Sequence, residues 1–152
     1  MTSRQVRDGE LLQSAHGSGV VRAVRRRAVL VVDDDPAYLR ALVQVLGARG
    51  HDVDGELHPR RALERVVADP ARFSALVTDL HMPELSGVEL AAAVRSVAPA
   101  MAIVLHSGQV SRALRRWAVD AVVPKHAGVD ALLRELDRVA ADGSAGANEA
   151  TG

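Results

Sequence analysis

The sequence predicts an α/β fold, in which a parallel sheet carries helices on both faces. Short runs rich in Val, Ile and Leu alternate along the chain with segments whose apolar residues recur at helical spacing. The runs are continuously apolar and too short for helices, a pattern typical of strands that are buried on both sides. Strand and helix alternate five times, and this alternation favours parallel strands joined by crossover helices.

The first strand is predicted at Ala28–Val32, directly before the first helix. That helix is predicted at Tyr38–Arg49, because Leu39, Leu42 and Leu46 share one of its faces. An amphipathic helix of this kind buries its apolar stripe against a sheet and leaves its other face in water. The first strand and the first helix therefore form the opening unit of the fold.

The second strand lies within Asp52–Leu57, which has few apolar residues and therefore fits the edge of a sheet. The remaining elements follow the same alternation. They are predicted, in order, as a helix at Arg60–Ala68, a strand at Ala75–Thr78, a helix at Val88–Val97, a strand at Met101–His106, a short helix around Arg112–Trp117, a strand at Ala121–Val123 and a helix at Val129–Ala141.

Both ends of the chain differ from the alternating part between them. Residues 1–27 show no sustained periodicity and end in a cluster of arginines, so we interpret them as a flexible leader. Residues 142–152 are small and polar, and we expect a disordered tail because they cannot bury enough apolar surface to become ordered. The folded domain is therefore predicted at residues 28–141.

Composition argues against several classes of function. The formal net charge is zero and aromatic residues make up only 2% of the chain, so neither nucleic-acid binding nor membrane binding is expected. The absence of cysteine excludes disulfides, thiolate metal sites and cysteine nucleophiles. No apolar run reaches the roughly 18 residues that span a bilayer, and no apolar segment of a signal peptide is present. We therefore expect a cytoplasmic protein.

Polar side chains stand at, or just beyond, the ends of four of the predicted strands. In parallel α/β sheets the ligand site lies beyond the carboxyl ends of the strands, so these side chains are expected to converge. Clustered carboxylates need a cation, and oxygen ligands favour Mg²⁺. A lysine and a hydroxyl suit phosphate oxygens, and a carboxylate can itself carry an acyl phosphate. In strand order the residues are Asp33, Asp34 and Asp35, then Asp79, then Ser107, then Lys125.

Each of these residues also has a simpler structural interpretation. Asp35 precedes a proline and a helix, so we interpret it as a helix N-cap. Asp79 stands before a proline-containing loop and Ser107 before a glycine, which fits turn chemistry. Lys125 taken alone is an ordinary surface lysine. Their joint position at four strand ends nevertheless favours one common site.

Two segments resemble the receiver domains of bacterial response regulators. Val29–Pro36 is similar to the opening of that family, and Leu76–Gly87, with the string DLHMPELSG, is similar to its phosphorylation-site segment. The resemblance covers about residues 28–141. It implies a flavodoxin-like, doubly wound sheet of five parallel strands in the order 2-1-3-4-5, together with five helices.

The resemblance also implies a role for each site residue. Asp79 matches the phosphoacceptor, and Ser107 and Lys125 match the hydroxyl and the lysine that bind the phosphoryl group. A sensor histidine kinase or a phosphotransfer protein would donate that group, and the module would signal by protein contact rather than act as an enzyme on other substrates. The implied Mg²⁺ ligands are Asp33, Asp34, Asp79 and the backbone carbonyl of His81.

The segment between the fourth and fifth strands departs from the family. Val122 stands three positions before Lys125, where an aromatic switch residue is common, and His126 replaces a frequent proline. The stretch from Ser107 to Lys125 is short, and His81 is an unusual neighbour of the acceptor. We therefore expect intact phosphorylation chemistry and altered signalling through the face built by the fourth helix, fifth strand and fifth helix.

Several alternatives stay open. Asp33 and Asp35 after an apolar strand resemble the haloacid dehalogenase type of phosphatase, but the chain offers no late acidic pair for its Mg²⁺ site. The fold could instead bind a partner protein irrespective of phosphorylation, and the arginines within residues 22–27 could contact nucleic acid. Because little chain follows the last helix, we expect a stand-alone receiver, with a homodimer as a further alternative.

Overall fold

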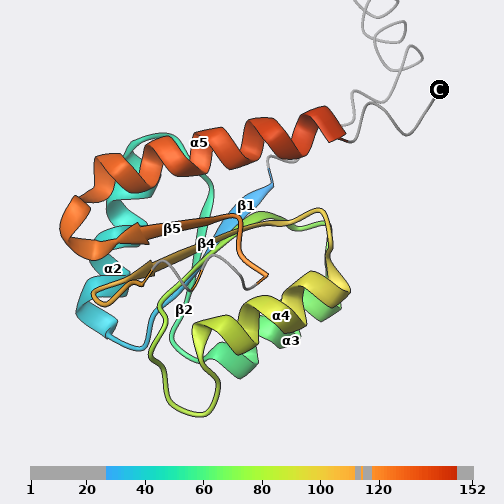
Figure 1. The fold of residues 1–152 in the computed structure, drawn as a ribbon, viewed down its shortest axis with the longest axis horizontal. Coiled ribbons are helices and arrows are strands. Elements are labelled where there is room, and N and C mark those ends of the chain that lie inside the picture. The colour runs from blue at the N-terminus through green and yellow to red at the C-terminus, as the bar shows by residue number, and fades with distance from the viewer. Residues whose placement is uncertain (1–26, 112–113, 115–117, 147–152) are drawn as a thin grey trace, which may run out of the picture.

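The computed structural model describes residues 27–111, 114 and 118–146. Within these residues the chain forms one five-stranded sheet in which every strand runs parallel to its neighbours, in the order β2-β1-β3-β4-β5 (Figure 1). The predicted fold class and strand order are therefore confirmed. The strands are β1 (Ala28–Val32), β2 (Val53–Glu56), β3 (Phe73–Thr78), β4 (Ala102–Ser107) and β5 (Ala121–Pro124).

Helices cover both faces of the sheet, with α5 above it and α3 and α4 below it in the view of Figure 1. The alternation of side chains along β1 accounts for two separate cores. Val29 and Val31 pack with α2 and α5, whereas Leu30 and Val32 pack with α3 and α4. The helices of the described residues are α2 (Pro36–Ala48), α3 (Pro59–Ala68), α4 (Gly87–Val97), the 3₁₀ helix η2 (Lys125–Ala127) and α5 (Val129–Gly146).

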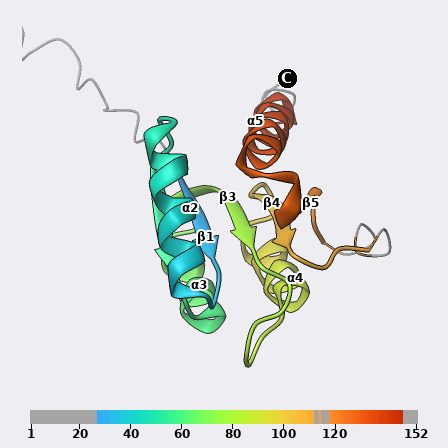
Figure 2. The ribbon, with the colours of Figure 1, turned by 90° about the vertical axis from the view of Figure 1, so that its left-hand side faces the viewer.

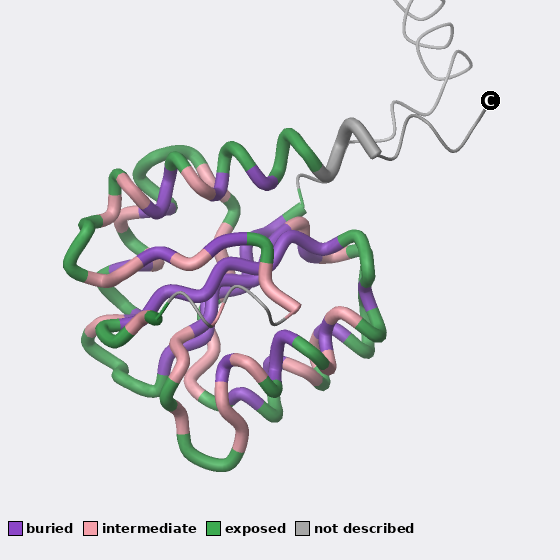
Figure 3. Tube along the Cα trace, in the orientation of Figure 1, coloured by how far each residue is buried: buried purple, intermediate pink, exposed green. Residues whose placement is uncertain are grey.

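Burial follows the position of each strand in the sheet. The central strands β1, β3 and β4 are almost wholly buried (Figure 3). By contrast, β2 is half-buried and pairs only with β1, which confirms the predicted edge strand. Figure 2 shows the strands side by side, so the carboxyl ends of β1, β3, β4 and β5 lie along one edge. The functional residues follow these ends.

Asp35 is the N-cap of α2. Its Oδ1 accepts hydrogen bonds from the backbone N–H groups of Ala37 at 3.0 Å and Tyr38 at 3.2 Å. Pro36 occupies the first helical position, where a missing N–H costs nothing. The cap therefore fixes where the chain leaves β1 and enters the helix.

Replacing Asp35 with alanine is expected to lower the free energy of unfolding by about 1 kcal/mol, because two N–H groups of the first turn lose their acceptor. Asp35→Asn keeps a capping oxygen and should stay close to the wild type. Urea unfolding followed by circular dichroism measures both variants. Equal losses in the two variants would show that charge, rather than capping, accounts for the effect.

The last helix is longer than predicted. α5 continues to Gly146, so the predicted start of the tail at residue 142 is too early by more than one helical turn. Arg138 pairs with Glu135 at 2.8 Å and with Asp142 at 3.2 Å along the same helix. The second of these pairs supports the helix as far as Asp142, beyond the last residue of its apolar stripe.

Two predictions concern segments largely outside the described residues. One is the leader at residues 1–27, of which only Arg27 is described, and the other is the short helix around Arg112–Trp117, of which only Leu114 is described. None of the helices that the structure describes is long and apolar enough to cross a membrane.

Candidate functional site

Three carboxylates meet at the carboxyl edge of the sheet. One oxygen from each of Asp33, Asp34 and Asp79 lies within 4.8 Å of the other two. Asp33 is buried, Asp79 is half-buried and Asp34 is exposed, so the cluster is open to solvent on one side. A ligand set made only of oxygens suits a hard cation such as Mg²⁺, which keeps several water ligands.

Backbone hydrogen bonds hold two of these carboxylates. The Asp79 N–H donates to the Val32 carbonyl at 3.0 Å, which ties the residue after β3 to the end of β1. The Leu80 N–H donates to Asp79 Oδ1 at 2.8 Å, and the Asp35 N–H donates to Asp33 Oδ1 at 2.9 Å. Both aspartates are thus anchored through Oδ1, and Oδ2 of each lies near Lys125.

Lys125 supplies a positive charge to the cluster from the residue after β5. Its Nζ lies 2.7 Å from Asp33 Oδ2 and 3.7 Å from Asp79 Oδ2. Burial alone would lower the pKa of Lys125, but the hydrogen bond to Asp33 and the charges of Asp33 and Asp79 outweigh burial and raise it above its ordinary value. The side chain is therefore a cation at neutral pH, aimed at the predicted acceptor.

Ser107 and His81 stand at the same edge of the sheet. Ser107 is the buried last residue of β4, lies in register with Pro124 of β5 and accepts a hydrogen bond from the Gln109 N–H at 3.5 Å. His81 is exposed in the loop that joins β3 to α4. The strand ends thus bring all the predicted residues to one region, with Asp35 used as the helix cap.

Two pockets flank the acidic cluster. Asp34 lines one of about 450 Å³ together with Leu57 and Glu84. His81 lines another of about 460 Å³ together with His126. Of the three clustered carboxylates, that of Asp34 lines one of these two pockets.

Sequence reasoning missed two residues beside Lys125. The Lys125 Nζ lies 4.2 Å from the centre of the Tyr38 ring, and the Tyr38 hydroxyl lies 2.6 Å from Nε2 of His106. The signal was a histidine inside an otherwise apolar strand, because a buried ring of that kind needs a hydrogen-bond partner. The partner itself, 68 positions away in the chain, could not be read from a local pattern.

Residues 29–137 match the model of a protein family described as the response regulator receiver domain. The chain belongs to the response regulator receiver family. The five-stranded order β2-β1-β3-β4-β5 agrees with that membership, as does the convergence of Asp33, Asp34, Asp79 and Lys125 at one sheet edge. The sequence-based assignment to CheY-like two-component receivers is confirmed.

Curated relatives of this receiver carry the same description. The chain is 32% identical over 111 residues to the response regulator receiver protein Anae109_2439 of Anaeromyxobacter, which covers 70% of this chain and 46% of that protein. It is 34% identical over 88 residues to the response regulator receiver protein CpdR of Brucella abortus, covering 58% of this chain and 72% of the relative. The chain thus spans less than half of the first relative's length.

Solved structures agree with the receiver fold. A CheY-like receiver domain protein from Methanospirillum hungatei superposes with a TM-score of 0.71 at 22% identity, covering 78% of this chain and 96% of that one. The response regulator TrrA of Thermotoga maritima, solved in complex with Mg²⁺-BeF, superposes with a TM-score of 0.69 at 27% identity. The match covers 74% of this chain and 98% of TrrA.

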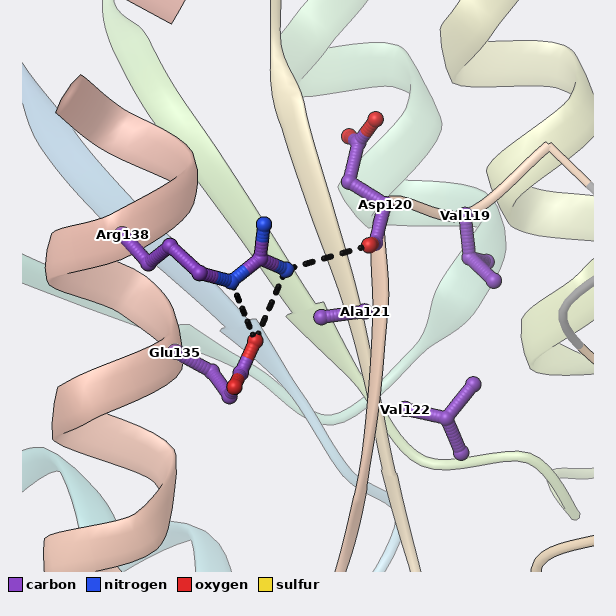
Figure 4. A pocket seen from close by; sticks show the side chains of 6 residues that line it. All are labelled: Val119, Asp120, Ala121, Val122, Glu135 and Arg138. Atoms are coloured by element: carbon purple, nitrogen blue, oxygen red, sulfur yellow. Dashed lines mark hydrogen bonds and ion pairs between the residues drawn. The ribbon is translucent and has the colours of Figure 1, made fainter. Parts of the chain in front are cut away.

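The receiver has a polar pocket of about 520 Å³ between β5 and α5 (Figure 4). Arg138 of α5 reaches across it to the Asp120 carbonyl at 3.5 Å while pairing with Glu135. Val122 points away from Arg138, on the other side of β5. A valine at this position carries no ring and no hydroxyl, so an aromatic switch there is absent.

The geometry argues against the phosphatase alternative. In that chemistry Asp33 would be the nucleophile and Asp35 the acid beside it. Instead, Asp33 is bound by Lys125, and Asp35 turns toward the N-terminus of α2. The second carboxylate is therefore committed to capping a helix rather than to proton transfer.

Proposed function

We propose that this receiver accepts a phosphoryl group on Asp79 from a sensor histidine kinase or a phosphotransfer protein, and that it signals by protein contact. The observation that carries the proposal is that the Asp79 carboxylate lies beside the carboxylates of Asp33 and Asp34, with its Oδ2 3.7 Å from the Lys125 ammonium. A carboxylate that lies next to both a cation site and a fixed positive charge is arranged for phosphoryl transfer.

Mg²⁺ would be held by the carboxylates of Asp33, Asp34 and Asp79 and by the backbone carbonyl of His81. The exposed position of Asp34 supports it as the most direct ligand, because Asp33 Oδ2 already accepts a hydrogen bond from Lys125. When bound, the cation supplies charge neutralisation for the crowded oxygens of donor and acceptor.

The residues of the chain account for the transfer itself. An oxygen of Asp79 attacks the phosphorus of a phosphohistidine, the O–P bond forms as the P–N bond breaks, and the electron pair returns to the imidazole nitrogen. Lys125 stabilises the charge on the phosphoryl oxygens, and the Ser107 hydroxyl donates to one of them. The Leu80 N–H holds the other carboxylate oxygen, so that the side chain does not rotate away.

Related structures support this chemistry. TrrA of Thermotoga maritima is described in complex with Mg²⁺-BeF. A response regulator from Burkholderia pseudomallei, 26% identical with a TM-score of 0.67 and covering 83% of this chain and 75% of that one, is described with a phosphorylated aspartic acid and a calcium ion. The oxygen-only donor set of Asp33, Asp34 and Asp79 fits a cation of the same hard class.

The test is to incubate the protein with Mg²⁺ and acetyl phosphate and to measure intact mass. The wild type should gain one phosphoryl group, and chelation of Mg²⁺ should prevent the gain. Asp79→Asn should gain nothing, because an amide is a poor nucleophile. Asp35→Asn is the matched control, since it makes the same charge change nearby and keeps the capping oxygen.

A second candidate function is binding of a partner protein irrespective of phosphorylation. Val122 favours it because this residue stands where an aromatic switch residue is common in the family. Failure of the wild type to gain mass at any Mg²⁺ concentration, with native circular dichroism, would overturn the phosphoacceptor proposal. That outcome would favour the second candidate.

A further inference from the structure

The ammonium of Lys125 contacts two carboxylates and the face of an aromatic ring. Nζ is 2.7 Å from Asp33 Oδ2 and 3.7 Å from Asp79 Oδ2, and it lies 4.2 Å from the centre of the Tyr38 ring. A cation at that distance from a ring face is attracted by the ring quadrupole, more strongly where water is partly excluded. Lys125 is only 23% exposed, so the contact is partly desolvated.

The Tyr38 ring is itself held by a buried histidine. The Tyr38 hydroxyl lies 2.6 Å from Nε2 of His106, and Nδ1 of the same ring lies 3.0 Å from the Val123 carbonyl. A carbonyl only accepts, so Nδ1 carries the proton and Nε2 accepts from the hydroxyl. Burial lowers the pKa of His106 below its ordinary value, which agrees with a neutral ring.

These contacts connect α2, β4 and β5 at the edge of the sheet that carries the acceptor. Tyr38 belongs to the first turn of α2, His106 precedes Ser107 in β4, and Val123 lies two residues before Lys125 in β5. The chain of bonds therefore begins and ends close to Lys125 and passes directly beside Ser107. Any shift of the Tyr38 ring would move the surface against which the ammonium rests.

A purely structural role for half-buried Tyr38 and buried His106 would not require this placement. An apolar pair of similar volume would fill the space between α2 and β4 without two hydrogen bonds. Replacing both partners of a buried hydrogen bond with apolar groups of the same shape can leave the free energy of unfolding nearly unchanged. What distinguishes Tyr38 is that its hydroxyl end is anchored while its ring face is turned to the one lysine at the acceptor.

We propose that Tyr38 is a positioning residue for Lys125 in the phosphorylation reaction: its ring, anchored by His106, keeps the ammonium over Asp79 when the cation and the phosphoryl group take over the carboxylate oxygens. This inference rests on the proposed function. The lysine must leave Asp33 to contact phosphoryl oxygens, and the ring limits that movement to the side facing the acceptor. A lysine without this support has many rotamers that point to solvent.

The first experiment compares initial rates of phosphorylation by acetyl phosphate at saturating Mg²⁺ in three proteins. Tyr38→Leu removes the ring face and is expected to lower the rate about tenfold. Tyr38→Phe keeps the ring and loses only the hydroxyl, and should lose no more than about threefold. Urea unfolding of each variant checks that the fold is retained at the assay temperature.

A double-mutant cycle separates positioning from simple structural damage. In a Lys125→Met background, Tyr38→Leu should cause no further loss of rate, because the group that the ring positions is gone. An equal, additive loss in both backgrounds would overturn the proposal. So would equal rates for Tyr38→Leu and the wild type.

A second readout does not depend on phosphorylation. Ring currents of Tyr38 should move the ε-methylene protons of Lys125 upfield in NMR spectra of the wild type and of Tyr38→Phe, and this shift should vanish in Tyr38→Leu. Its absence in the wild type would overturn the Tyr38 inference even if Asp79 is phosphorylated. If the shift is observed but the wild type takes up no phosphoryl group, the proposed function is overturned. The role of Tyr38 in that reaction then falls with it.

Discussion

An alanine at position 87 is expected to destabilise this receiver by about 3 kcal/mol and to disturb the acceptor at the same time. Gly87 begins α4, and a Cβ at this position would collide with the backbone carbonyl oxygen of Asp79. It would also lie 2.9 Å from the Asp79 carbonyl carbon and 3.0 Å from Leu105 Cδ1. Neither the backbone nor the packed leucine can move away cheaply.

The close approach is itself required by hydrogen bonds. The Gly87 N–H donates to the Leu80 carbonyl at 2.8 Å, and the Asp79 N–H donates to Val32 at 3.0 Å. To admit a methyl group, the start of α4 or the turn after β3 has to shift. That turn carries the acceptor, so the rate of phosphorylation should fall together with stability.

Urea unfolding and the acetyl phosphate assay measure both effects. Gly47→Ala is the matched control, because a Cβ there meets nothing within 4 Å in the exposed part of α2. It should raise stability by about 0.5–1 kcal/mol through helix propensity and leave phosphorylation unchanged. Wild-type stability and rate in Gly87→Ala would contradict the described packing of α4 on Asp79.

Replacing Lys125 with methionine is expected to change two properties in opposite directions. The rate of phosphorylation should fall about 100-fold, because the transferring oxygens lose a fixed positive charge. Mg²⁺ binding should tighten about tenfold, because the ammonium 2.7 Å from Asp33 Oδ2 no longer competes with the cation for that carboxylate. A lysine that merely supported the fold would not separate these two properties.

Isothermal titration with Mg²⁺ and the mass-based rate assay test this pair of effects. Lys125→Arg is the comparison variant, since it keeps the charge but replaces a compact ammonium with a planar fork. Its Mg²⁺ affinity should stay nearer to that of the wild type, while its rate should still be reduced. Weaker Mg²⁺ binding in Lys125→Met would contradict the competition inferred from the geometry.

Local patterns were sufficient to predict much of this receiver. The apolar runs ending at Val32 and Thr78 identified buried parallel strands, and parallel strands bring their carboxyl ends to one edge. Asp33, Asp79 and Lys125 could therefore be grouped before any contact was known, since each directly follows a strand. The proline after Asp35 identified the helix cap in the same way, because capping depends on neighbours in sequence.

Other features depend on distances that no local pattern contains. α5 extends past the last residue of its apolar stripe, and the Arg138–Asp142 ion pair supports the first part of that extension. The sequence placed Gly87 at the end of the phosphorylation-site segment, but the contact of this glycine with the Asp79 backbone emerges only once α4 packs against the sheet.

The sequence by itself determined the strands, their ends and the acidic and basic residues that follow them, because these follow from hydrophobic periodicity and strand direction. Only the tertiary structure decided which side chains touch within that group. Lys125 meets Asp33 across 92 positions and rests on Tyr38, which His106 holds from a third element. Such pairings arise from the packing of helices on a sheet, so they depend on rotations and separations that the order of residues does not specify.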